Sequence, residues 1–217
     1  MSLFDYSHCD FKHIKKHKGI VYLDTQGYKK PYGDYFEEGL IFSKDAYEEF
    51  LKEENVFTSY KIIIFPTDID QILLFENKNQ IKNFLTNGGI LLNFAPTYLQ
   101  YLPKLPLYTA SKTPIKLRDI EPLEHCITRG VKSYDISYRR GVKGFFSRGF
   151  IDCPKNAEIF LKDSDGRCVA YVDNTQGLLI HTAGADLLGF GFFENSTAKR
   201  LAFNLLLWLE GHLKEIG

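Results

Sequence analysis

The sequence predicts an α/β fold with a mostly parallel central sheet that is covered by helices on both faces. Three apolar runs of strand length, 18–24, 60–65 and 90–94, lack the alternation of a half-exposed strand, as expected for parallel strands buried on both faces. A helical pattern separates each run from the next, and this strand–helix–strand order favours parallel strands joined by right-handed crossovers. We therefore expect a flavodoxin-like three-layer sandwich.

The first strand–helix unit begins with the run 18–24, which ends in the carboxylate of Asp24. Residues 27–42 are rich in Gly, Tyr and Lys, and we expect them to form a long loop. Ser43 offers a side-chain oxygen as N-cap for a helix whose apolar residues recur at helical spacing over 46–51. The unit thus ends a buried strand with polar groups and returns through a helix.

The second unit runs from the strand 60–65 through a helix over 76–87 to the strand 90–94. Pro66 follows the first of these strands and ends it. Gly88 stops the helix, because glycine accepts the left-handed conformation that follows many helix C-termini.

The second half of the chain begins with a less regular segment, 97–155, that contains several prolines. After it, two β-rich stretches flank Asp-Ser-Asp-Gly at 163–166, which predicts a β-hairpin over 157–171. The apolar run 177–181 predicts a further core strand. We expect one domain over 1–217, with 97–155 as an irregular insertion.

The last element is a predicted helix that Asn195 or Ser196 caps and that ends near Leu213. Its apolar residues, such as Leu201 and Leu205, recur on one face, so this helix is expected to cover the sheet.

Composition excludes some classes of partner. The chain has 27 basic and 27 acidic residues, so its formal net charge is zero and gives no reason to expect nucleic acid or an anionic membrane. We find no secretory signal and no apolar run of the roughly 18 residues that a membrane span needs. The four cysteines are scattered and are expected to be free thiols, so we expect a cytoplasmic protein.

The order of these elements and several short sequence segments resemble a known protein family. The segments are PKNAEIFLKDSDGRCVAYVD, QGLLIH and STAKRLAFNLLLWLE, together with a stretch at 125–130 that is similar to HPIT-G. Over residues 18–212 the chain resembles the class I glutamine amidotransferase-like superfamily, especially its non-amidotransferase, ThuA-like branch. The resemblance implies the same sheet and the same place for a site.

The resemblance also implies a catalytic triad, which this sequence does not complete. Enzymes of the superfamily carry a cysteine nucleophile on the turn after the third parallel strand, where this chain reads Phe-Ala-Pro-Thr-Tyr at 94–98. Pro96 further removes a backbone N–H that could stabilise an oxyanion. His181 matches the histidine of the triad, but Ala183 stands at the place of its acidic partner. We therefore expect no glutamine hydrolysis.

Candidate binding residues follow from the predicted sheet, because ligands of open parallel sheets bind beyond the carboxyl ends of the strands. That rule brings seven residues to one crevice: Asp24, Thr25, Gln26, Thr67, Asp68, Asn93 and His181. An alternative interpretation is that Asn93 and Thr67 only tie down loops and that Asp68 caps the next helix.

Two further patterns bear on the crevice. Tyrosines and phenylalanines are frequent over 28–36 and 98–108, and aromatic faces pack on sugar rings, although a core or a homodimer interface explains them equally well. Basic and aromatic residues alternate between Arg139 and Arg148, which suits phosphate or stacking contacts or a solvated loop.

His13 and His17 have a spacing that is typical of metal ligands. Neighbouring lysines disfavour a bound cation, however, so we expect no metal and no cofactor.

These observations leave two hypotheses. The first is a non-catalytic protein that binds a small polar ligand or a protein partner; the resemblance implies a carbohydrate ligand. The second is an enzyme, hydrolytic or sugar-directed, that uses His181 with Asp68 or Asp24 as a catalytic pair. The position of His181 distinguishes them: contact with a carboxylate beside an open cavity favours the enzyme, whereas burial disfavours it.

Overall fold

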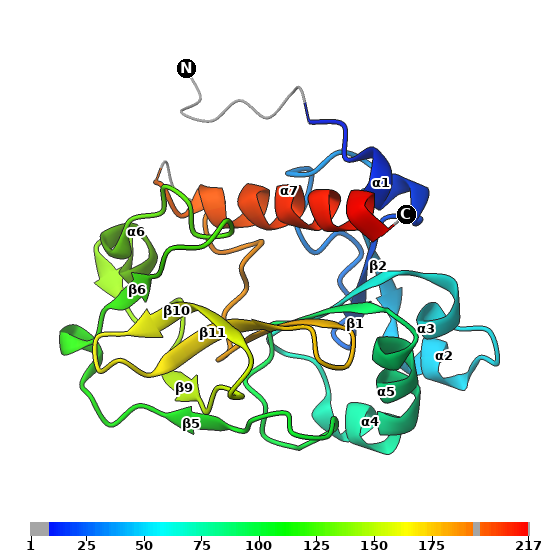
Figure 1. The fold of residues 1–217 in the computed structure, drawn as a ribbon, viewed down its shortest axis with the longest axis horizontal. Helices are drawn as coiled ribbons and strands as arrows, with labels where there is room; N and C mark the ends of the chain where they lie inside the picture. Colours follow the sequence, from blue (N-terminus) through cyan, green and yellow to red (C-terminus); the bar gives the residue numbers. More distant parts are fainter. Residues whose placement is uncertain (1–8, 193–195, 217) are drawn as a thin grey trace.

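The fold is a central sheet between two layers of helices, seen in a computed structural model that describes residues 9–192 and 196–216 (Figure 1). The sheet has eight strands, of which the first five in spatial order are parallel and the last three alternate in direction. Their order is β2 (Ile41–Asp45), β1 (Ile20–Asp24), β3 (Ile62–Phe65), β4 (Ile90–Asn93), β12 (Leu178–Thr182), β11 (Cys168–Asp173), β10 (Glu158–Asp163) and β6 (Ile120–Pro122).

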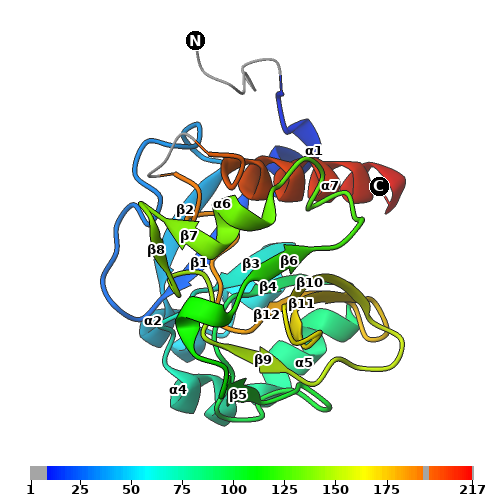
Figure 2. The ribbon, with the colours of Figure 1, turned by 90° about the vertical axis from the view of Figure 1, so that its left-hand side faces the viewer.

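Helices lie on both sides of this sheet, as Figures 1 and 2 show from two directions. On one side α7 (Lys199–Ile216) runs across the sheet beside the short α1 (Lys12–Lys16). On the other side lie α4 (Gln71–Glu76) and α5 (Lys78–Thr86). The flavodoxin-like three-layer class predicted from the sequence is therefore confirmed.

Shorter elements complete the fold. Near β2 lie α2 (Ala46–Leu51) and α3 (Val56–Ser59). The segment between β4 and β10 carries the remaining elements, which are β5 (Tyr108–Ala110), the 3₁₀ helix η1 (Ile115–Leu117), β6, α6 (Ser133–Ser137), β7 (Tyr138–Arg139), β8 (Val142–Lys143) and β9 (Gly149–Ile151). Strands β5 and β9 pair, as do β7 and β8, while β6 joins the edge of the main sheet.

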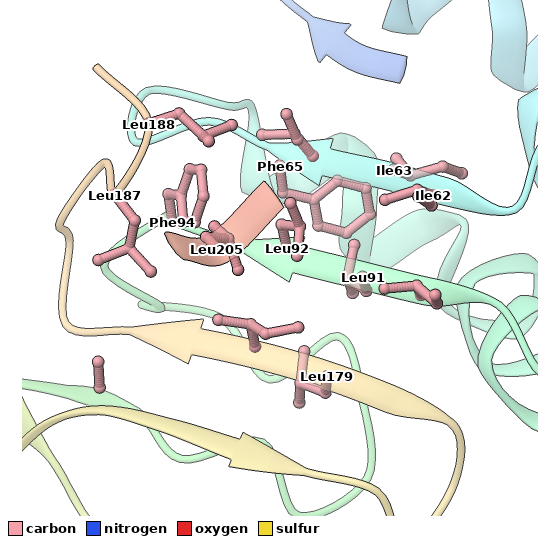
Figure 3. Packing of buried hydrophobic residues seen from close by; sticks show 14 of the residues in the cluster. Ile62, Ile63, Phe65, Leu91, Leu92, Phe94, Leu179, Leu187, Leu188 and Leu205 are labelled. Atoms are coloured by element: carbon pink, nitrogen blue, oxygen red, sulfur yellow. The ribbon is translucent and has the colours of Figure 1, made fainter. Parts of the chain in front are cut away.

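The core lies on the two faces of the parallel strands (Figure 3). Every residue of β3 and β4 is buried, which is why these strands read as uninterrupted apolar runs. Leu205 of α7 packs over Leu92 and Phe94 on one face. Phe65 reaches the helices of the other face through Phe57, with ring centroids 6.4 Å apart. Each such side chain contributes roughly 1.5–3 kcal/mol by leaving water.

The predicted loop 27–42 and the cap at Ser43 are corrected by the structure. The last two residues of the loop and Ser43 belong to β2, and Asp45 caps α2 by accepting the N–H of Glu48 at 3.1 Å. Strand β2 is an edge strand whose side chains are half-exposed, so its sequence lacks the apolar run that identifies its neighbours.

The predicted helices are correct in place but differ in their ends. The helix expected over 76–87 is preceded by α4, from which it is separated at Asn77, whose side chain donates to the carbonyl of Leu73 at 2.8 Å. The last helix begins at Lys199 and continues past Leu213 to Ile216. Of its two expected caps, Asn195 lies outside the described residues, and Oγ of Ser196 accepts no hydrogen bond from the residues that the structure describes.

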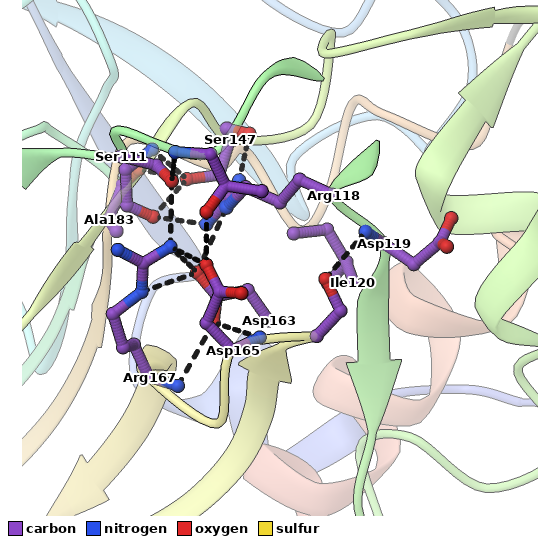
Figure 4. Close-up of polar contacts among 12 residues, drawn as sticks. Ser111, Arg118, Asp119, Ile120, Ser147, Asp163, Asp165, Arg167 and Ala183 are labelled. Carbon is purple, nitrogen blue, oxygen red and sulfur yellow. Dashed lines mark hydrogen bonds and ion pairs between the residues drawn. The ribbon is translucent and has the colours of Figure 1, made fainter. Parts of the chain in front are cut away.

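The predicted hairpin is confirmed as β10 and β11, and a buried ionic cluster attaches the 97–155 segment to it (Figure 4). Asp163 ends β10 and is fully buried, with its Oδ2 2.9 Å from Nε of Arg118 and 3.1 Å from Nε of Arg167. Arg118 also donates to the carbonyls of Ser147 at 2.7 Å and Gly149 at 2.5 Å. The guanidinium of Arg118 thus joins three separate stretches of chain.

Candidate functional site

An open cavity of about 550 Å³ lies beyond the carboxyl ends of the parallel strands. Thr67, which follows β3, forms one side, and Gly184 and Asp186, which follow β12, form another. This is the place where ligands of open parallel sheets bind. The long loop after β1 and the 139–146 region close the remaining sides through Tyr32, Tyr35, Arg139, Phe145 and Phe146.

Aromatic residues supply six of the thirteen residues that line the cavity. Tyr32 meets the ring of Phe192 edge-on at 6.0 Å between centroids, and Tyr35 stacks on Phe192 at 3.6 Å. On the opposite side Phe146 meets Phe190 edge-on at 4.9 Å. These rings come from three distant parts of the sequence and hold one another in place, so the cavity has preformed apolar walls.

Asp186 is the acidic side chain of the cavity, and one of its two oxygens is fixed by the protein. Its Oδ1 accepts the backbone N–H groups of Leu188 at 2.9 Å and Gly189 at 3.0 Å, and the hydroxyl of Tyr32 at 3.3 Å. Its Oδ2 accepts no hydrogen bond from any residue that the structure describes. The carboxylate is therefore oriented through one oxygen and leaves the other for a ligand.

The backbone beside Asp186 is built for this orientation. A Cβ at Gly189 would lie 2.5 Å from Oδ2 of Asp186, so a side chain at this position would displace the carboxylate. Burial raises the pKa of Asp186 above its ordinary value of 3.8, and the two backbone donors oppose that shift.

Two further carboxylates, Asp24 and Asp68, lie at the ends of the neighbouring strands β1 and β3. Burial, followed by the charge of Asp24, raises the pKa of Asp68, and the charge of Asp68 in turn adds to the rise at Asp186. Asp24 is buried, and its Oδ1 accepts the N–H of Gln26 at 2.8 Å. None of these three carboxylates forms an ion pair with a residue in the described ranges. The cavity edge is therefore locally negative.

Neighbouring groups fit this negative environment. Burial raises the pKa of Tyr22, and the charges of Asp68 and Asp186 raise it further. The pKa of Tyr32 is raised by burial and by Asp186, so both phenols stay protonated. Arg139 brings a positive charge to the wall, with its guanidinium 5.8 Å from the ring centroid of Phe145.

His181 lies beneath the site rather than in it. It is fully buried on β12, and its Nδ1 lies 2.9 Å from Nδ2 of Asn93, which is equally buried on β4. Its Nε2 lies 3.5 Å from Oγ1 of Thr97, and no carboxylate of the described residues hydrogen-bonds to the ring. Burial lowers the pKa of His181 to about 4, so the ring is neutral near pH 7. The geometry gives no support to the expected catalytic pairing of His181 with Asp68 or Asp24.

The remaining predicted residues are divided between loop contacts and the cavity. Thr25 accepts the N–H of Asp70 at 3.1 Å, and the side-chain amide of Gln26 donates to the carbonyl of Asp68 at 3.3 Å. Both contacts tie the loop after β1 to the loop after β3. Thr67 lines the cavity. Asp70, rather than Asp68, caps α4 by accepting N–H groups of its first turn.

Sequence reasoning did not select Asp186, which supplies the carboxylate of the cavity lining. Asp186 follows a strand end in a stretch rich in glycine, from 184 to 191, which was the available signal. Within the described part of the chain, no group of three or more histidine, cysteine, aspartate or glutamate side chains is placed to hold a metal ion.

Comparisons with known proteins support the fold alone. No protein-family model matches the chain, and no curated protein sequence matches it. A solved structure, the cytoplasmic protein STM3548 from Salmonella typhimurium, matches with a TM-score of 0.50 and 15% identity, over 77% of this chain and 80% of that one. No helix within residues 9–192 and 196–216 is both long and apolar enough to cross a membrane.

Proposed function

We propose that the chain is a non-catalytic binding protein that holds a small polar ligand in the cavity beyond β1, β3 and β12. One observation carries the proposal. Asp186 is oriented through Oδ1 by two backbone donors and by Tyr32, while its Oδ2 has no partner among the described residues. A fixed polar group inside apolar aromatic walls is the usual composition of a small-molecule site.

The same geometry favours binding over catalysis. The cavity brings no cysteine to its walls, and the turn that carries the nucleophile in the resembled enzymes holds Pro96 and the buried Thr97 here. His181 contacts Asn93 and Thr97 in the interior. A general base must come within hydrogen-bond reach of a substrate proton, and a ring with no exposed surface does not.

The walls limit the chemistry of the ligand. Aromatic faces pack against C–H groups of a sugar or against an organic cation, and a carboxylate oxygen accepts a hydrogen bond or attracts a positive charge. The ThuA-like resemblance makes a carbohydrate one candidate within this range. A protein partner that inserts a side chain into the cavity is the alternative, and Phe145, which is 54% exposed, would contact it at the rim.

Cellular context belongs to the same proposal. The neighbour STM3548 is called a cytoplasmic protein, and we propose the same compartment for this chain. Because the formal net charge is zero, we propose neither nucleic acid nor a membrane surface as its partner.

A ligand screen with matched variants tests the proposal. Saturation-transfer NMR against monosaccharides, polyols, amino acids and small amines should identify binders of the wild type that Asp186→Asn and Phe145→Ala weaken at least tenfold. The control is Asp173→Asn, which removes a carboxylate from a separate cavity of about 600 Å³ lined by Tyr171 and Gly177. Binders that respond to Asp173→Asn alone, or no binder at all, would overturn the proposal.

A further inference from the structure

We propose that the ligand of this cavity carries an organic cation, and that a quaternary or methylated ammonium group lies between the aromatic rings and Asp186. The inference rests on the proposed function, because it names the ligand class for the same cavity. It depends on two features, the local charge and the kind of wall.

The charge at this edge of the sheet is unbalanced, although the whole chain is neutral. Elsewhere buried carboxylates have partners: Asp163 lies between Arg118 and Arg167, and Glu49 pairs with Lys52 at 2.6 Å. By contrast, the buried Asp24 and the half-buried Asp186 pair with no basic residue in the described ranges, and neither does the exposed Asp68, whose charge acts on Asp186.

Mutual repulsion is the consequence of this arrangement. Asp24 destabilises the ionised form of Asp68, and Asp68 destabilises the ionised form of Asp186. A bound cation would relieve that repulsion, whereas a neutral sugar would not. In the cavity lining itself, Arg139 and Asp186 each supply one charge, and the additional negative charge comes from Asp24 and Asp68 outside the lining.

The aromatic side chains that line the cavity suit an organic cation better than a metal ion. Ring faces attract cations through their negative π-surface, and methyl groups on nitrogen pack against the same rings. Phe145 already shows this mode of contact, with the Arg139 guanidinium 5.8 Å from its centroid. A metal ion needs several converging oxygens, and the described residues offer no such group of three.

A pair of isosteric probes isolates the charge. Choline and 3,3-dimethyl-1-butanol have the same shape, but the alcohol has carbon in place of the charged nitrogen. Isothermal titration calorimetry at pH 7.5 should show choline binding at least tenfold more tightly than the alcohol. The preference should shrink as salt rises from 20 to 500 mM, because the interaction is electrostatic.

Variants test where the preference arises. Asp186→Asn keeps an oxygen that can accept the two backbone N–H groups, and it should reduce the choline preference at least fivefold. Phe145→Ala lies at an exposed position, is expected to fold normally, and should weaken choline binding as well. Asp173→Asn, in the other cavity, should leave the preference unchanged.

The outcomes separate this inference from the function on which it rests. Equal binding of choline and its neutral isostere, or binding of a sugar that responds to Asp186→Asn without binding of choline, overturns the cation and leaves the proposed function standing. Absence of any binder among cations, sugars and polyols overturns both. If Asp186→Asn and Phe145→Ala both leave choline binding unchanged, the cation binds elsewhere and the inference is overturned.

Discussion

Asn93 and His181 hold one another in the interior, with Nδ2 of Asn93 2.9 Å from Nδ1 of His181 and neither side chain exposed. They sit opposite each other on the adjacent parallel strands β4 and β12. The backbone carbonyl of Pro106 also faces the ring, so a neutral imidazole has a donor on one side and an acceptor on the other. The histidine that the resemblance assigns to catalysis is a structural link between two strands here.

This burial predicts an acid-sensitive step in stability. The pKa of His181 is about 4 in the folded protein against an ordinary 6.5, so the unfolded chain takes up the proton more readily. The contribution of neutral His181 is complete above pH 6.5 and is lost as the pH falls toward 4, with a total of about 3 kcal/mol. Urea unfolding of the wild type and His181→Gln at several pH values measures it.

The quantity to compare is the difference in the free energy of unfolding between the wild type and His181→Gln, because the titration of carboxylates affects both proteins alike. The stability of the wild type should approach that of His181→Gln as the pH falls from 6.5 to 4. Parallel curves over this range would show that His181 is not the group responsible.

The buried cluster around Arg118 predicts a large loss of stability on single substitution. Arg118→Met leaves Asp163 without one partner and removes one donor from each of two carbonyls, and should cost about 3–5 kcal/mol in the free energy of unfolding. Lys162→Met, which breaks the half-exposed pair with Glu121, should cost less than about 1 kcal/mol. Similar losses for the two variants in urea unfolding would contradict the structural role of Arg118.

Asp186→Asn should leave the protein at least as stable as the wild type at pH 7. The reason is that burial raises the pKa of Asp186, so its ionised form is disfavoured in the folded state near neutral pH. An asparagine oxygen can still accept from Leu188 and Gly189. A clear loss of stability in urea unfolding would mean that the carboxylate is needed for folding rather than for binding.

Cysteine reactivity provides a check on the packing beside β11. All four cysteines are free thiols, as expected, and Sγ of Cys153 donates to the carbonyl of Pro154 at 3.4 Å. Cys126 is exposed, whereas Cys168 is buried and has a raised pKa. Iodoacetamide followed by mass spectrometry should modify Cys126 first and Cys168 last. Early modification of Cys168 would show that β11 and its surroundings open in solution.

Much of the fold could be predicted because its central strands are buried on both faces. The runs that became β1, β3, β4 and β12 are buried throughout and mostly apolar, and the hairpin turn at 163–166 has its own local signal. Strand β2 was not predicted, because an edge strand forms by pairing with its neighbour and its own sequence does not need an apolar run. The hydrophobic pattern of a short segment does not show whether it pairs with a distant strand.

The site was predicted less well for a geometric reason. The rule of strand ends points to the edge of the sheet where the cavity lies and includes Thr67 of its lining, but it does not specify which way a side chain points. His181 and Asn93 point into the core, whereas Asp186 is turned into the cavity by hydrogen bonds to Leu188 and Gly189. Those bonds, and the closure by Tyr32 from 154 residues away, depend on loops that periodicity does not describe.

The most direct test of the central claim is an amide NMR titration of the ¹⁵N-labelled protein with the tightest-binding compound of the ligand screen. Saturable shifts at Leu188 and Gly189, whose N–H groups hold Asp186, are predicted, with no change at Asn156 and Gly177 in the separate cavity. Shifts confined to Asn156 and Gly177, or saturable shifts at Leu188 and Gly189 that persist in Asp186→Asn with unchanged affinity, would contradict a ligand site built on Asp186.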